Sequence, residues 1–266
     1  GGGTMGAGIA EVFLRAGRRV VLCETTEEAA EAARARVVGG LRGTEPAGDA
    51  GAPAALLQVV VGIPDQPAEV AIEAVFENSA LKRSVLAEVE ARVPDDALLA
   101  SNTSSLSIGD LARSLTRPER FLGMHFFNPV PRSSLVELVT GPATAPQAVE
   151  RARQLVRLLD KEEIVVRDSP GFATSRLGVA IGLEAVRMLE EGVASAEDID
   201  RGMVLGYRFP MGPLRLTDLV GLDVRLAIAE HLERQLGERF APPRLLREKV
   251  AAGELGKKTG QGFFTW

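Results

Sequence analysis

The chain opens with Gly1-Gly2-Gly3-Thr4-Met5-Gly6, continues in a helical pattern, and then reaches the apolar run Arg19-Val20-Val21-Leu22-Cys23-Glu24. The first segment fits G-x-G-x-x-G, in which bare glycines let the backbone approach a pyrophosphate at a helix N-terminus. In such sites an acid about 20 residues further on, at the end of the next strand, binds the ribose hydroxyls. A flexible glycine-rich terminus is the alternative, but the helix and Glu24 favour a dinucleotide site.

The acid at position 24 also predicts which cofactor binds. A carboxylate there repels the 2′-phosphate of NADP, and Thr25-Thr26 supplies no arginine to bind one. We therefore predict NAD. A strand normally precedes such a glycine turn, and we expect one of about six to eight residues before Gly1 in the full protein.

Strand-like and helix-like segments alternate through the first 167 residues. Helices are predicted over 27–41, 81–91 and 147–159, strands over 59–61, 70–77, 97–101 and 163–166, and an irregular Gly/Pro loop over 42–55. This alternation predicts a parallel, doubly wound sheet, whose ligands bind beyond the carboxyl ends of the strands. That edge would carry Glu24, Glu77, residues 102–105 and His125.

His125 is one of only two histidines in the chain, and Glu137 follows it inside an apolar, strand-like run. A histidine with a carboxylate to fix its tautomer can move a proton at neutral pH. A buried histidine bonded to a backbone carbonyl is the ordinary alternative. The polar residues expected at the same sheet edge favour the functional interpretation.

Composition changes at Asp168-Ser169-Pro170-Gly171-Phe172, where we place a domain boundary. Residues 168–266 are helical in pattern, with helices over 172–191, 214–236 and 243–252. A helical module of about 100 residues has little room for a private core and often pairs with a copy of itself. A homodimer is therefore expected.

Bulk composition excludes several classes of function. The net charge of −5 argues against a nucleic-acid surface, and no apolar run reaches the roughly 18 residues that span a bilayer. The single cysteine forms no intrachain disulfide, and no Cys/His cluster has metal-ligand spacing. We expect a cytoplasmic protein that binds neither membranes nor metals.

Together these motifs resemble the L-3-hydroxyacyl-CoA dehydrogenases, the NAD-linked enzymes of fatty-acid β-oxidation. His-Phe-Phe-Asn-Pro at 125–129 and Gly-Lys-Lys-Thr-Gly at 256–260 are the specific parts, and the matches run in family order over essentially the whole chain. The matching segments are 1–6, 73–77, 101–106, 123–131, 135–137, 168–172, 210–213, 218–223 and 256–263.

The resemblance implies a Rossmann-type NAD-binding domain over 1–167 and an all-helical dimerisation domain over 168–266. It implies reversible oxidation of an L-3-hydroxyacyl-CoA to the 3-oxoacyl-CoA, with His125 as the base, Glu137 as its orienting partner and Ser104 near the substrate hydroxyl. By the same resemblance, the residues that bind the cofactor would be Gly1, Gly3, Thr4, Met5, Gly6, Glu24, Ala74, Glu77, Lys82, Asn102, Ser104 and Asn128.

Two departures concern the substrate. Ser175 replaces the family asparagine that helps to hold the acyl portion, and a hydroxyl keeps one donor but lacks the amide's carbonyl acceptor. The family segment that contacts the CoA nucleotide is shortened here to 42–55, and no lysine lies between residues 25 and 81 to contact the CoA phosphate. Arg34, Arg36 and Arg42 are either substitutes for that lysine or solvated helix charges. Two alternatives follow: the same chemistry on a small free hydroxy acid, as in gulonate and carnitine dehydrogenases, and a non-catalytic NAD-binding scaffold.

Overall fold

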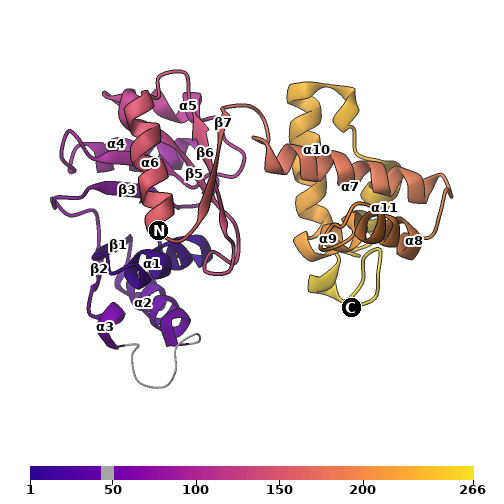
Figure 1. Ribbon diagram of the computed structural model, residues 1–266, viewed down its shortest axis with the longest axis horizontal. Coiled ribbons are helices and arrows are strands. Elements are labelled where there is room, and N and C mark those ends of the chain that lie inside the picture. The colour runs from indigo at the N-terminus through magenta and orange to yellow at the C-terminus, as the bar shows by residue number, and fades with distance from the viewer. Residues whose placement is uncertain (43–50) are drawn as a thin grey trace. The chain divides into compact units, whose positions relative to one another are not determined.

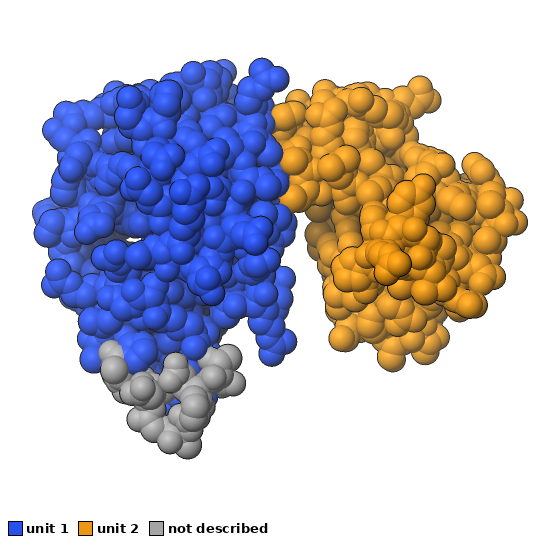
Figure 2. Space-filling view, in the orientation of Figure 1, with its two compact units in different colours: residues 1–168 blue, residues 169–266 orange. Residues whose placement is uncertain are grey.

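The structure, a computed structural model, describes residues 1–42 and 51–266 (Figure 1). It divides into two compact units, Gly1–Asp168 and Ser169–Trp266 (Figure 2). Each unit contains a hydrophobic core of its own. The domain ranges proposed from the sequence, 1–167 and 168–266, differ from these units by a single residue at the boundary.

Unit 1 contains two sheets. β1 (Val20–Glu24) and β2 (Leu57–Val61) form a parallel pair, and the larger sheet has the order β3-β4-β5-β6-β7. Its strands are β3 (Val70–Glu73), β4 (Leu98–Ser101), β5 (Phe121–Phe126), β6 (Leu135–Thr140) and β7 (Glu162–Arg167). In the described residues β1 pairs only with β2 and β3 only with β4. The strand expected before Gly1 lies outside this chain and stays a prediction.

One strand pair departs from the parallel arrangement. β5 and β6 are antiparallel, whereas the other neighbours in this sheet are parallel. The connection over 127–134 is shorter than the dozen or more residues that a parallel crossover needs. This hairpin brings the start of β6 to the edge where β5 ends.

Helices cover both faces of the larger sheet, which confirms the doubly wound fold. α1 (Thr4–Arg15) and α6 (Pro146–Leu158) pack on one face. α4 (Ser79–Glu90) and α5 (Ile108–Ala112) contact the strands from the other side, where a Cβ on Gly123 would lie 2.8 Å from the Ile108 side chain. Because Gly123 has no side chain, α5 can pack closely against β5 at this position.

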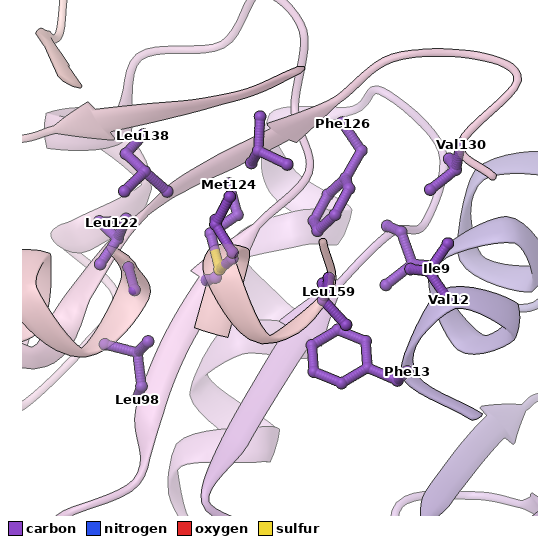
Figure 3. Packing of buried hydrophobic residues seen from close by; sticks show 14 of the residues in the cluster. Ile9, Val12, Phe13, Leu98, Leu122, Met124, Phe126, Val130, Leu138 and Leu159 are labelled. Atoms are coloured by element: carbon purple, nitrogen blue, oxygen red, sulfur yellow. The ribbon is translucent and has the colours of Figure 1, made fainter. Parts of the chain in front are cut away.

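Helix α1 is buried on two sides. Figure 3 shows Phe13 and its neighbours on α1 packed toward Met124 and Phe126 of β5. The opposite side of α1, including Leu14, packs with Leu22 of β1 and with α2 (Glu27–Arg42). Helix α1 is therefore the element that joins the two sheets.

Unit 2 is helical, as the sequence predicts. Its core is formed mainly by α7 and α10, and α8, α9 and α11 contribute further buried residues. The segment 214–236 divides at Gly221, whose φ of 103° is readily adopted only by glycine. The elements are α7 (Thr174–Glu190), α8 (Ala196–Arg201), η2 (Gly202–Gly206), α9 (Pro213–Val220), α10 (Leu222–Leu236), η3 (Glu238–Phe240), α11 (Arg244–Ala251) and η4 (Lys257–Thr259).

The C-terminal tail is held by Asp218 of α9, a fully buried carboxylate. Its oxygens accept hydrogen bonds from the backbone N–H groups of Phe263 and Phe264 at 2.8 and 2.9 Å and from the Trp266 indole at 2.9 Å. A Cβ on Gly262 would lie 2.3 Å from the same carboxylate. Gly262 therefore lets the tail approach close enough for these bonds.

The predicted loop over 42–55 lies mostly at 43–50, outside the described residues. Within the remainder, Gly51–Ala54 forms the short helix α3, so the prediction of irregular structure is wrong there. A single helical turn carries too little periodic pattern to be recognised from sequence.

Candidate active site

The glycine turn lies at the N-terminus of α1. Gly3 is the N-cap and makes no side-chain cap, so the first N–H groups of the helix have no side-chain acceptor. A Cβ on Gly3 would meet no atom within 4 Å, whereas a Cβ on Gly6 would lie 1.8 Å from the Gly1 carbonyl oxygen. Open space before these N–H groups, at the positive end of the helix dipole, fits a pyrophosphate.

Glu24 stands beside this turn at the end of β1. Its Oε1 accepts a hydrogen bond from the backbone N–H of Gly2, and its second oxygen is available for a ribose hydroxyl. Ala74, the residue directly after β3, adjoins the turn, since a Cβ on Gly1 would lie 3.2 Å from the Ala74 carbonyl oxygen. The structure thus gathers these predicted cofactor residues at one place: Gly1, Gly3, Thr4, Met5, Gly6, Glu24 and Ala74.

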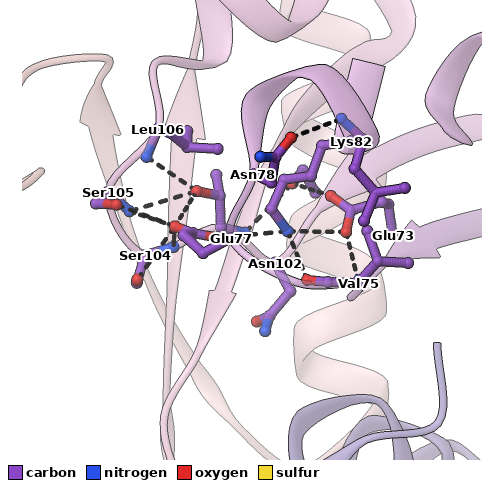
Figure 4. Close-up of polar contacts among 12 residues, drawn as sticks. Glu73, Val75, Glu77, Asn78, Lys82, Asn102, Ser104, Ser105 and Leu106 are labelled. Atoms are coloured by element: carbon purple, nitrogen blue, oxygen red, sulfur yellow. Dashed lines mark hydrogen bonds and ion pairs between the residues drawn. The ribbon is translucent and has the colours of Figure 1, made fainter. Parts of the chain in front are cut away.

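A buried ion pair holds the end of β3 (Figure 4). The ammonium of Lys82, 1% exposed, lies 2.8 Å from Glu73 Oε1 and donates to the Val75 carbonyl at 3.1 Å. The second oxygen of Glu73 accepts from the Ser101 hydroxyl at 2.6 Å. Lys82 therefore holds the backbone at Val75 in place through its hydrogen bond to the Val75 carbonyl. Its predicted contact with the cofactor stays a prediction.

Glu77 organises the turn that follows β4. Its Oε1 accepts from the Thr103 hydroxyl at 2.6 Å and from the N–H groups of Ser104 and Ser105 at 2.9 and 3.0 Å, while Oε2 lies 3.4 Å from Lys82 Nζ. Burial alone would raise the pKa of Glu77, but these hydrogen bonds and the Lys82 charge outweigh it and hold the pKa below the ordinary 4.5. Glu77 thus fixes the turn that carries the exposed Ser104.

His125 and Glu137 face each other across β5 and β6. They are direct register partners, and His125 Nδ1 lies 3.0 Å from Glu137 Oε2. Glu137 is fully buried and His125 is 7% exposed. Because β5 and β6 are antiparallel, residues twelve apart in sequence become neighbours. The two predicted residues therefore form one pair.

Two asparagines flank this pair. Asn102 Oδ1 accepts the backbone N–H of Phe126 at 2.9 Å, which joins the turn after β4 to the end of β5. Asn128 is exposed in the loop between β5 and β6. Lys161, an almost fully buried ammonium, donates to the carbonyls of Val130 and Ser133 and so anchors that loop.

Two parts of the prediction stay open. Ser175 lies in the first turn of α7 in unit 2, and its contact with the substrate stays a prediction. The CoA-facing loop falls on residues outside the described ranges.

Sequence reasoning missed Glu73 and Lys161, and it placed Thr103 at the sheet edge without predicting its bond to Glu77. An acid inside an apolar run, as at Ile72-Glu73-Ala74, was the available signal for Glu73. The carbonyl partners of Lys161 could be found only in three dimensions.

Two absences hold for residues 1–42 and 51–266. No group of three or more His, Cys, Asp or Glu is arranged to hold a metal ion. No helix in that part of the chain is long and apolar enough to cross a membrane.

Comparison with known families matches both units. Residues 1–169 match the 3-hydroxyacyl-CoA dehydrogenase NAD binding domain, and residues 171–266 match the 3-hydroxyacyl-CoA dehydrogenase C-terminal domain. A 3-hydroxybutyryl-CoA dehydrogenase of Mycobacterium tuberculosis is 42% identical over 100% of this chain and 96% of its own. The mitochondrial hydroxyacyl-coenzyme A dehydrogenase of Sus scrofa is 37% identical over 100% of this chain and 89% of its own.

Solved structures are similar over the same span. The (S)-3-hydroxybutyryl-CoA dehydrogenase PaaH1 from Ralstonia eutropha superposes with a TM-score of 0.94 at 39% identity, over 100% of this chain and 96% of that one. FadB2 of M. tuberculosis gives a TM-score of 0.93 at 42% identity with the same coverage.

The Glu77 network predicts a pH-dependent contribution to stability. Because the folded-state pKa is lowered, the contribution is complete above about pH 4.5 and is lost as the pH falls through the folded-state value. We expect the difference in unfolding free energy between wild type and Glu77→Gln, from urea titrations, to be constant down to about pH 5 and to shrink below it.

Glu88→Gln is the control, because the Glu88 side chain is exposed and pairs with Arg92, four residues further along the chain. A Glu77→Gln difference that stayed constant to about pH 3 would contradict a charge-dependent role of Glu77.

Proposed function

The chain belongs to the 3-hydroxyacyl-CoA dehydrogenase family, and we propose that it oxidises the hydroxyl group of a 3-hydroxyacyl-CoA thioester with His125 as the general base. The enzyme is an NAD-dependent oxidoreductase, and the proposed reaction is reversible. The observation that carries the role of His125 is its 3.0 Å contact with a fully buried carboxylate at the end of β5.

The pair fixes which nitrogen of His125 takes the proton. With a proton on Nδ1 directed at Glu137, the lone pair lies on Nε2, which accepts the proton of the substrate hydroxyl. Glu137 then stabilises the imidazolium through the same contact. Bound NAD supplies the acceptor for the hydride from C3. In the reverse direction the imidazolium returns its proton to the carbonyl oxygen.

Other residues orient the reactants. The Ser104 hydroxyl donates to Glu77 Oε1 at 3.3 Å in this structure, and on substrate binding it turns this single proton to the substrate oxygen. Asn128 lies on the anchored loop beyond β5. The first-turn N–H groups of α1 bind the pyrophosphate, and Glu24 binds the adenosine ribose. Ser175 contributes one hydroxyl to the acyl portion.

Since NAD and acyl-CoA are metabolites of the cell interior, we assign the enzyme to the cytoplasm.

His125→Gln is expected to lower kcat by about 10²- to 10⁴-fold, the range for loss of a general base. Glu137→Gln is expected to lower kcat by about 10²-fold, because the amide cannot stabilise the imidazolium charge. The Kd for NADH, from nucleotide fluorescence, should change by less than about twofold in both.

The matched control is His231→Gln, which makes the same change at the other histidine, on α10 in unit 2. It should leave kcat unchanged. Equal rates for wild type and His125→Gln would remove the catalytic assignment, and a large loss of NADH affinity in Glu137→Gln would contradict the orienting role.

The substrate class is tested by following NADH absorbance with acetoacetyl-CoA and with free acetoacetate. We expect turnover of the thioester and little of the free acid. A short acetoacetyl thioester without the nucleotide separates recognition of the thioester from recognition of CoA. Turnover of the free acid alone would replace the CoA assignment with the small-hydroxy-acid alternative, and turnover of neither would favour the non-catalytic scaffold.

We also propose that unit 2 mediates a homodimer. Three helices that pack against one another expose large apolar side chains: Leu177 (64%) on α7, Leu219 (45%) on α9 and Val224 (41%) on α10. Apolar surface of this kind marks an interaction site, and a second copy of the chain is the simplest occupant.

Leu177→Glu combined with Leu219→Glu is expected to convert the dimer to a monomer in light scattering, because two charges would be buried without partners. Leu158→Glu, at an exposed leucine on α6 of unit 1, is the control and should leave the mass unchanged. A wild-type chain that is monomeric at all concentrations would exclude the dimer.

A further inference from the structure

An arginine from α2 lies against the glycine turn. Arg36 Nη1 donates to the carbonyl oxygen of Gly2 at 3.1 Å, and the N–H of the same Gly2 donates to Glu24. The guanidinium of Arg36 and the carboxylate of Glu24 therefore hold the two polar backbone groups of one residue. An acid and a cation thus stand together at the ribose end of the dinucleotide site.

The bare glycine explains why this helix comes so close. A Cβ on Gly2 would lie 2.3 Å from the Cβ of Ala33, which is fully buried one turn before Arg36 on α2. Residues three apart share a helix face, so the contact of Ala33 with the turn also directs Arg36 toward it. The position of Arg36 is fixed by this packing.

Arg36 retains capacity to bind a ligand. It is exposed, and in residues 1–42 and 51–266 its hydrogen bond to Gly2 uses one of five guanidinium donors. A guanidinium binds a phosphate through paired N–H donors, and keeps its charge at all accessible pH values. The remaining donors match a phosphate group in charge and geometry.

The two side chains have opposite preferences for the cofactor. A strand-end acid binds the ribose hydroxyls of NAD and repels a 2′-phosphate, whereas a nearby arginine accommodates that phosphate in NADP sites. This chain carries both. The sequence around Thr25 offered no arginine, but the fold supplies one from the third turn of α2.

We propose that Glu24 alone excludes NADP from this enzyme, and that Arg36 is a latent ligand for the 2′-phosphate which becomes effective once the Glu24 charge is removed. The proposal rests on the proposed function, because it takes the glycine turn as the cofactor site. In the wild type Arg36 serves the turn by binding the Gly2 carbonyl. Cofactor choice is then decided by a single carboxylate.

The test measures the Kd of NADPH and of NADH by calorimetry, together with kcat/KM, in Glu24→Ser and in Glu24→Ser/Arg36→Ala. Serine removes the charge and makes room for a phosphate. We expect NADPH to bind wild type at least about 10²-fold more weakly than NADH, and Glu24→Ser to recover most of that factor. Adding Arg36→Ala should undo at least about tenfold of the gain.

Two further variants make the result specific. Glu24→Ser/Arg19→Ala removes another exposed arginine, at the opposite end of β1, and should keep the NADPH gain. Glu24→Gln removes the charge but keeps an acceptor for the Gly2 N–H, and should recover part of the NADPH affinity if the serine variant proves unstable.

Retention of the full NADPH gain in Glu24→Ser/Arg36→Ala would overturn the role of Arg36. NADH binding without any NADPH gain in both Glu24 variants would overturn the claim that this carboxylate excludes NADP. If wild type bound neither nucleotide, the proposed function would fail and this inference with it.

Discussion

The close approach of the backbone at the glycine turn is the constraint on which unit 1 depends. A side chain at Gly6 would overlap the Gly1 carbonyl, and one at Gly2 would overlap Ala33 of α2. These contacts fix where α1 begins, and α1 in turn packs on both sheets. The same bare backbone leaves N–H groups open to an anion. Packing and cofactor recognition therefore both require that these residues have no side chain.

The proton-transfer pair depends on a second constraint, the short connection between β5 and β6. It forces an antiparallel pair, and the register then places Glu137 opposite His125. A fully buried carboxylate is costly unless it is partnered. The strand register provides the partner, because it places Nδ1 of His125 3.0 Å from the Glu137 carboxylate. In the proposed mechanism this carboxylate stabilises the positive charge that the imidazole ring gains when Nε2 takes the proton.

The local sequence pattern predicted part of the fold and part of the candidate site. Alternating segments predicted the doubly wound sheet. Strand ends predicted a shared edge for Glu24, Glu77 and His125, but Glu24 ends a strand of the two-stranded sheet, whereas His125 lies in the five-stranded one. The position of Arg36 could not be predicted, because it depends on how closely α2 packs against the turn. Lys82 could be recognised as a site residue, but not as a buried one with three oxygen partners, since burial is a property of the assembled fold.

This protein has a net negative charge, so a negatively charged cofactor must be attracted by the local charges and dipoles of its binding site and not by the charge of the whole protein. The chain carries a net charge of −5, and Glu24, Glu73, Glu77 and Glu137 all belong to the site region. Glu73 and Glu77 are compensated by Lys82, and Glu137 faces His125. Glu24 instead has its oxygen on a neutral backbone N–H. Of the four, Glu24 is the carboxylate that the proposed site places beside the adenosine ribose, so its charge is the one that a 2′-phosphate would sense most strongly.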